Sequence, residues 1–184
     1  MNINYKKSLK LITLLITSLL IATVSASVYY SLSMTSTVSV ATNNVYFVLG
    51  ADNGTAGVTL GSDNTTATLA SLKAYPNATM TYTDPLRVRN NATSGTTNVR
   101  LRPVSLTGTA TNFIFVNFTL VAVSDSSTKA SLNYTSNGSI WSTPSTTGFV
   151  PIDASAEWYV TIETKAIASA ASDSVTIAIT VDVE

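Results

Sequence analysis

Residues 113–123 read FIFVNFTLVAV, and the apolar side chains of this stretch repeat at every second position. An extended chain would separate four apolar residues from two polar ones, with Ile114, Val116, Phe118 and Leu120 on one face and Asn117 and Thr119 on the other. Side chains alternate across a strand, so a period of two predicts a β-strand with one buried face.

The same alternation continues on both sides of this stretch. Gly, Asn, Ser and Pro residues separate the alternating segments, which are residues 45–50, 79–89, 99–102, 113–123, 158–162 and 175–183. This spacing predicts about eight or nine strands. We therefore expect an all-β fold, a single two-sheet β-sandwich of the jelly-roll or immunoglobulin-like kind over residues 43–184. Residues 52–54 (DNG) predict a turn, and residues 165–172 (KAIASAAS) a short helical turn.

Residues 27–42 precede this domain and begin with an unusually long alternating segment. Its inward row would consist of large apolar side chains, namely Val28, Tyr30, Leu32, Met34, Val38 and Val40. At ~3.3 Å per residue, thirteen residues would span roughly 43 Å, about twice the length of an ordinary strand. The segment is a candidate donor strand that adds to a sheet of the next copy of the protein. The alternative is an edge strand that pairs within its own domain.

Residues 1–26 have the layout of a secretory signal peptide. Three lysines precede the apolar run of residues 11–24, and small residues at 24–26 form a cleavage site before Ser27. A transmembrane anchor would need about 20 apolar residues, more than this run supplies. A third interpretation is a type IV pilin-like subunit that retains the apolar segment as a helix, but Lys10 and the alternation after Ser27 argue against it.

The composition argues against an enzyme, and we expect no cofactor and no metal site. The chain contains neither histidine nor cysteine, so the usual catalytic triads, thiol nucleophiles and zinc sites have no ligands or bases. Only 11% of the residues are charged, and the formal net charge is zero. This balance does not favour a nucleic acid as a partner, and we expect contact with a membrane only during export.

Seven asparagines lie in N-x-[ST] sequons, which accept N-linked glycans in exported proteins. They are Asn53, Asn64, Asn77, Asn91, Asn117, Asn133 and Asn137. Several fall in turn signals, and Asn117 falls on the polar face of its expected strand. We expect several of them to carry glycans where the host glycosylates exported proteins.

The four arginines form a possible contact patch. Arg87 and Arg89 alternate on one expected strand, and Arg100 and Arg102 alternate on the next, so a hairpin would place all four on one face. Like charges across a strand pair repel each other unless an anionic group lies over them. Acidic residues of the same chain (Asp153, Glu157 or Glu163), a neighbouring subunit or an acidic glycan would each serve.

The chain resembles the archaeal surface filaments known as threads and bundling pili, which are similar to bacterial TasA-type matrix fibres. The segments that carry the resemblance are STVSV at residues 36–40, YPNATMTYTDPLRVRNN at 75–91 and VRLRPVSLTG at 99–108. The resemblance implies a β-sandwich, secretion by the general pathway, heavy N-glycosylation and polymerisation by donation of the N-terminal strand, here Ser27 to about Val40.

We therefore expect the structural subunit of an extracellular cell-surface filament, a head-to-tail homopolymer that serves adhesion or biofilm formation. The alternative is a monomeric surface adhesin, a carbohydrate-binding protein in which Trp141, Trp158 and Tyr159 form an aromatic platform. Alternation argues against this platform because it would bury Trp158.

Overall fold

The computed structural model describes residues 10, 12–13, 44–168 and 174–184. The chain divides into two units, Met1–Ala41 and Thr42–Glu184. In the first unit only Lys10, Ile12 and Thr13 are described, and they are helical. The predicted signal peptide, its alternatives and the candidate donor strand therefore lie almost entirely outside the described residues. No helix in the described part of the chain is long and apolar enough to cross a membrane.

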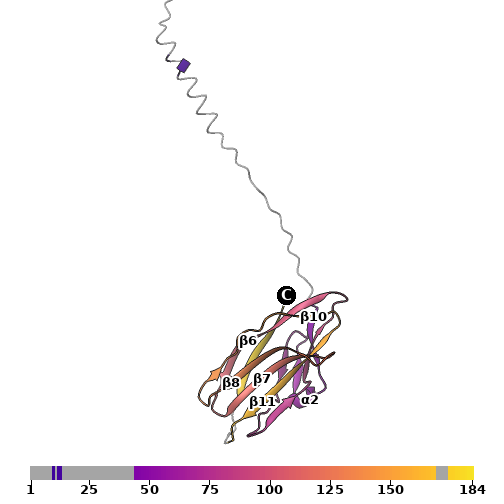
Figure 1. The fold of residues 1–184 in the computed structure, drawn as a ribbon, viewed down its shortest axis with the longest axis vertical. Helices are drawn as coiled ribbons and strands as arrows, with labels where there is room; N and C mark the ends of the chain where they lie inside the picture. Colours follow the sequence, from indigo (N-terminus) through magenta and orange to yellow (C-terminus); the bar gives the residue numbers. More distant parts are fainter. Residues whose placement is uncertain (1–9, 11, 14–43, 169–173) are drawn as a thin grey trace, which may run out of the picture. The chain divides into compact units, whose positions relative to one another are not determined.

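The second unit is an all-β sandwich, which confirms the predicted fold class (Figure 1). Its larger sheet has seven strands in the order β1-β5-β11-β7-β8-β9, with β4 also paired to β11. These strands are β1 (Val45–Leu49), β4 (Thr79–Tyr82), β5 (Leu86–Asn90), β7 (Phe113–Ala122), β8 (Thr128–Ser136), β9 (Trp141–Ser142) and β11 (Glu157–Ala166).

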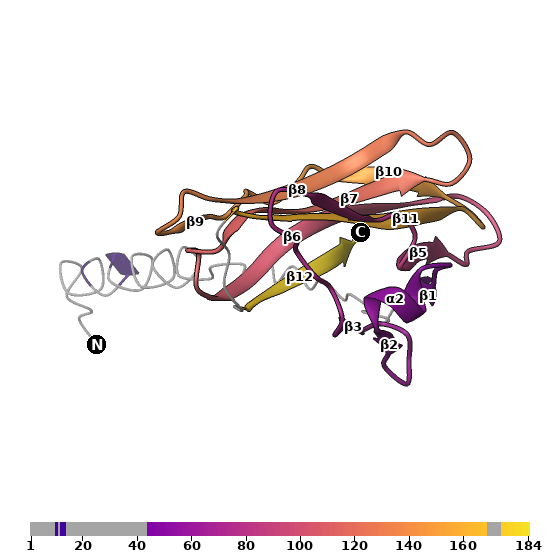
Figure 2. The ribbon, with the colours of Figure 1, turned by 90° about the horizontal axis from the view of Figure 1, so that it is seen from below.

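The smaller sheet has three strands in the order β10-β6-β12. Its central strand is β6 (Thr96–Gly108), flanked by β10 (Val150–Asp153) and β12 (Val175–Val183). Figure 2 shows β12 next to β6, at one edge of this sheet. A separate two-stranded ribbon pairs β2 (Val58–Leu60) with β3 (Ala67–Leu69). The predicted turn at residues 52–54 begins the short helix α2 (Asn53–Ala56), which ends at Gly57 in the left-handed conformation.

One hydrophobic core lies between the two sheets. The even-numbered residues of β7 and β11 point into it, including Val116, Leu120 and Ile162. From the smaller sheet, Val99 and Leu101 of β6 complete the core and are 0% and 2% exposed. Burying such side chains stabilises a fold by roughly 1.5–3 kcal/mol each. The inward row predicted for residues 113–123 is thus confirmed, with one exception.

That exception is Ile114, which was expected inside and is exposed. Along β7, Phe115 pairs with Lys165 while Phe113 pairs with Ala166, so Ile114 is the extra residue of a β-bulge. A bulge breaks the strict alternation of faces and turns the extra side chain outward. Val104 of β6 is exposed for the same reason, because Pro103 and Ser105 pair with the consecutive residues Ile179 and Ala178.

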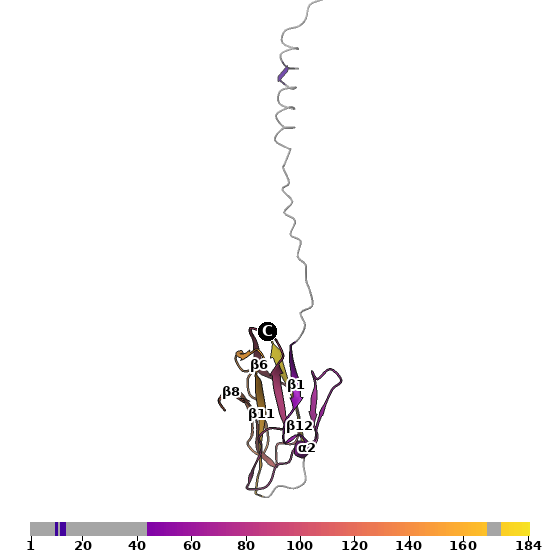
Figure 3. The same cartoon turned by 90° about the vertical axis from the view of Figure 1, so that its right-hand side faces the viewer.

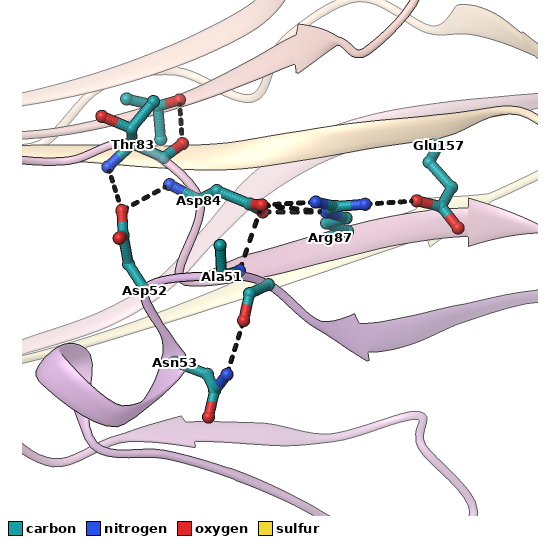
Figure 4. A network of polar contacts seen from close by, with 9 residues as sticks. Ala51, Asp52, Asn53, Thr83, Asp84, Arg87 and Glu157 are labelled. Carbon is teal, nitrogen blue, oxygen red and sulfur yellow. Dashed lines mark hydrogen bonds and ion pairs between the residues drawn. The ribbon is translucent and has the colours of Figure 1, made fainter.

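A polar cluster joins the turn after β1 to the turn between β4 and β5 (Figure 4). A side-chain oxygen of Asp52, Oδ2, accepts hydrogen bonds from the backbone N–H groups of Thr83 and Asp84, both at 3.0 Å. In return, Oδ2 of Asp84 accepts the backbone N–H of Ala51 at 3.1 Å. The reciprocal bonds fix the two turns against each other, and the buried Asp84 is the central member of the cluster.

Candidate functional site

The outer edge of β12 is an unpaired edge of the smaller sheet in the described residues. β12 pairs with β6 along its whole length, in an antiparallel register that runs from Val175 opposite Gly108 to Val183 opposite Val99. Among the residues that the structure describes, no strand pairs with its other edge. Figure 3 shows β6 and β12 side by side from another direction.

The hydrogen-bond pattern shows which groups of β12 face this open edge. Glu184 and Asn98 exchange both of their backbone bonds, at 2.9 and 3.0 Å. In an antiparallel pair, bonded and non-bonded positions alternate, so Ile179, Val181 and Val183 direct their N–H and C=O groups away from β6. The partner of Val181 obeys the same rule, because the N–H and C=O of Leu101 bond to Thr147 on the opposite side of β6.

The inward side chains of β12 are less covered than those of its neighbour. Ile177, Ile179 and Val181 are only partly buried, although they pack against the core. Val183 is 40% exposed, whereas its partner Val99 is 0% exposed. An apolar row that is covered from one side only marks a place where a further strand would bury more surface.

β12 also lacks the features that usually protect a sheet edge. Native edge strands are kept from pairing by shortness, proline, lysine or inward charges. At the opposite edge of the same sheet, β10 has four residues and contains Pro151. β12 has nine residues, VTIAITVDV, with neither proline nor lysine. Its one charged residue, Asp182, is held by β6.

Asp182 anchors β12 to β6 on the outer face of the smaller sheet. Its carboxylate accepts hydrogen bonds from Nε of Arg102 at 2.9 Å and from Nε of Arg100 at 3.0 Å. These bonds lower the pKa of Asp182 below its usual range, and the bond from Arg102 has the largest effect. The guanidinium of Arg100 also lies 4.4 Å from the ring centroid of Phe149.

This anchor predicts a loss of stability in acid. A carboxyl whose pKa is lower in the folded than in the unfolded chain stabilises the fold above its unfolded pKa, and this contribution is lost as the pH falls through the folded pKa. We expect Asp182→Asn to lower the urea midpoint at pH 7, and we expect this deficit to shrink as the pH falls below the pKa of an unfolded aspartate, about 4. A deficit that stays constant in acid would contradict the role of the charge.

The predicted single arginine patch is wrong. β5 pairs with β1 and β11, while β6 pairs with β10 and β12, so the two arginine pairs lie on different sheets and form no hairpin. Arg87 binds Asp84 and Glu157, and Arg89 lies 3.2 Å from Glu157. Of Asp153, Glu157 and Glu163, the three partners proposed from the same chain, only Glu157 forms an ion pair with an arginine in the described residues. Alternation gave no means of finding Asp84, which lies in the turn three residues before Arg87, or Asp182, whose partners depend on which strands pair.

The sequon asparagines lie on the surface of the unit. Five of the seven are exposed, namely Asn64, Asn77, Asn91, Asn133 and Asn137. The other two are partly buried and hydrogen-bonded: Nδ2 of Asn53 donates to the carbonyl of Gly50, and Oδ1 of Asn117 accepts the hydroxyl of Ser131. Asn117 and Asn133 are direct partners across β7 and β8. The glycans themselves remain a prediction.

The three aromatic residues of the adhesin alternative do not form one platform. Trp158 is 4% exposed and belongs to the core, as alternation predicted. Tyr159 follows it on the opposite face, where its ring lies 5.0 Å from the guanidinium of Arg87. Trp141 lies apart from both along the chain, on β9, and packs against Phe113 with ring centroids 5.6 Å apart.

Comparison with known proteins adds no functional assignment, since neither a protein-family model nor a curated protein matches the chain. In the described residues, no group of three or more acidic side chains could hold a metal ion. The unpaired edge of β12, with its partly buried apolar row, is the structural feature from which we propose a function.

Proposed function

We propose that the protein is the repeating subunit of an extracellular filament, and that each subunit adds residues 27 to about 40 to the edge of β12 in the next subunit. The observation that carries the proposal is the unpaired edge of β12 with its half-covered apolar row. The resemblance of the sequence to thread and bundling-pilus subunits points to the same mode of assembly.

The dimensions of the two partners agree. β12 has nine residues and therefore extends over roughly 30 Å, whereas residues 28–40 would extend over roughly 43 Å as a strand. The donor segment could pair with all of β12 and leave several residues to bridge the two subunits. Main-chain hydrogen bonds to Ile179, Val181 and Val183 would supply affinity, and the inward apolar row of the donor would cover that of β12.

The chemistry of the two partners also agrees. Residues 28–40 contain no charged side chain and no proline. On β12 the carboxylate of Asp182 is already neutralised by two arginines. Pairing would therefore bury no unpaired charge. Because the donor contains no proline, each of its residues also has a backbone N–H that can form a hydrogen bond. Because the donor and the acceptor edge are different surfaces of one chain, the contact is head-to-tail. It generates an open filament unless the rotation between successive subunits closes a ring.

The test compares mature protein from Ser27 onward with a truncated form that lacks residues 27–40. We expect the mature protein to form filaments in electron micrographs and the truncated form to be a folded monomer on size-exclusion chromatography. A synthetic peptide of residues 27–42 should bind the truncated form, and a control peptide with serine in place of Leu32 and Met34 should not.

Two results would contradict the proposal. If the mature and truncated forms are both folded monomers, the segment pairs within its own domain. If the truncated form still makes filaments, another surface drives assembly.

A further inference from the structure

A shallow hollow lies beside the turn between β8 and β9. It has a volume of about 320 Å³ and is lined by Thr135, Ser136, Asn137, Ile140, Trp141 and Ser142. Ile140 is 67% exposed, the highest exposure of any large apolar side chain in the described residues of the sandwich. Ile140 and the half-buried Trp141 together place apolar surface beside this turn.

The turn itself presents a sequon asparagine to this hollow. Asn137-Gly138-Ser139 lies between paired residues Ser136 and Trp141, and Gly138 takes a φ of +86°, which favours glycine. The Oδ1 atom of Asn137 accepts the backbone N–H groups of Ser139 at 3.0 Å and Ile140 at 2.9 Å. The carboxamide is thus fixed through its oxygen, and its nitrogen, the atom that a glycan modifies, belongs to an exposed side chain at the rim.

We propose that Asn137 carries an N-linked glycan whose first sugars pack into this hollow against Ile140 and Trp141. The inference rests on the export part of the proposed function. In the transfer, the Asn137 nitrogen bonds to the anomeric carbon of a lipid-linked oligosaccharide. The carbon–oxygen bond to the lipid phosphate breaks, the phosphate leaves with the bonding electrons, and the nitrogen loses one proton.

The packing has a simple physical basis. The C–H faces of a pyranose ring are apolar, and they stack on aromatic and aliphatic side chains while the hydroxyl groups stay in water. The rim supplies polar partners for those hydroxyls, in the side chains of Thr135 and Ser142. Trp141 is held for such a contact, because its ring packs on Phe113 and its Nε1 donates to the carbonyl of Thr109 at 3.3 Å. No other sequon asparagine lines this hollow.

The test uses the full chain, exported from a host that N-glycosylates. Ser139→Ala removes the acceptor sequence but keeps the backbone N–H that Asn137 binds. Thr93→Ala removes the sequon of the exposed Asn91 and serves as the matched control. We expect glycopeptide mapping to find a sugar on Asn137, and we expect loss of that sugar to lower the melting temperature by about 2–4 °C. The control should not change it.

Tryptophan fluorescence gives a second readout, because the chain has two tryptophans and Trp158 is buried. Ser139→Ala should make Trp141 more accessible to acrylamide, and Thr93→Ala should not. Ile140→Ser keeps the sequon but removes one of the two apolar contacts, so in this background Ser139→Ala should lower the melting temperature by less.

Three outcomes would overturn the inference. An unmodified Asn137 beside other modified sequons would refute it and leave the filament proposal untouched. Equal effects of Ser139→Ala and Thr93→Ala would refute the packing. If the chain is recovered outside the cell with no sequon modified, this inference fails and the export of the chain stands.

Discussion

A Val181→Pro variant should donate a strand but accept none, so it should not form filaments by itself. The N–H of Val181 points to the open edge of β12, and proline removes this donor without removing a bond to β6. The proline ring also occupies the space in which a partner backbone would lie. We expect the affinity of the 27–42 peptide for truncated protein carrying this change to fall at least about tenfold.

A mixture of the Val181→Pro variant with the truncated form tests this prediction most directly. The Val181→Pro variant keeps its donor segment, and the truncated form keeps its acceptor edge, so neither should polymerise alone. Together they should form dimers with one copy of each, which light scattering coupled to size-exclusion chromatography would detect. Filaments from the Val181→Pro variant alone would place the acceptor elsewhere.

Two further variants separate pairing from folding. Val181→Ala keeps the edge N–H and should still polymerise, although it loses part of the apolar row. Val183→Lys places a charge on the inward row at a position that is 40% exposed, which is how natural edges prevent pairing. It should block assembly while circular dichroism melts stay close to those of the unmodified protein.

Gly50→Ala should have the largest effect on stability. A Cβ at this position would overlap the backbone carbonyl oxygen and the Oδ1 of Asp84. The turn after β1 would have to move away from Asp84 and give up bonds of the polar cluster that joins it to the β4–β5 turn. We expect a loss of roughly 3 kcal/mol, measured by urea unfolding of the truncated form.

Gly54→Ala is the matched control. Gly54 lies in the helix α2, and apart from the neighbouring residues and the helix backbone no heavy atom lies within 4 Å of the position where its Cβ would be. Alanine in a helix is favoured over glycine by up to about 1 kcal/mol, so this change should be neutral or stabilising. A similar loss for both variants would show that the effect at Gly50 is not steric.

The sequence was sufficient to predict the faces of the strands. The even-numbered residues Val116, Phe118 and Leu120 are buried as the period of two required. A period of two indicates only that the local backbone is extended and which face of the strand is buried. It fails where one extra residue enters a strand, as at Ile114, because nothing in the local sequence marks a bulge.

Which strands pair was beyond the reach of the sequence. Arg87 and Arg100 lie thirteen residues apart, and a hairpin was the simplest connection between their strands. The chain instead crosses from the larger sheet to the smaller one after Asn90, which itself is buried and donates to the carbonyl of Ile152 in β10. The carboxylates that bind these arginines come from distant or turn positions, so no spacing rule identifies them.

The open edge of β12 could not be predicted either. The sequence of residues 175–183 shows an inward row and an outward row, but both are compatible with a central strand. Only the sheet order shows that one side of this strand has no neighbour among the described residues. The hydrogen-bonded pair Glu184–Asn98 then identifies the residues of β12 whose backbone groups face that open side.

The orientation of the groups along β12 also bears on how such a filament would carry a load. The backbone groups of Ile179, Val181 and Val183 are spaced along the strand, and bonds made to them would lie across its axis. In a filament whose donated strands lie along its axis, a pull along the filament would act parallel to those strands. All of these bonds then resist sliding at the same moment, whereas a strand peeled from one end would lose them singly. An edge with this geometry suits a fibre under tension, and it requires neither a disulfide nor a metal ion.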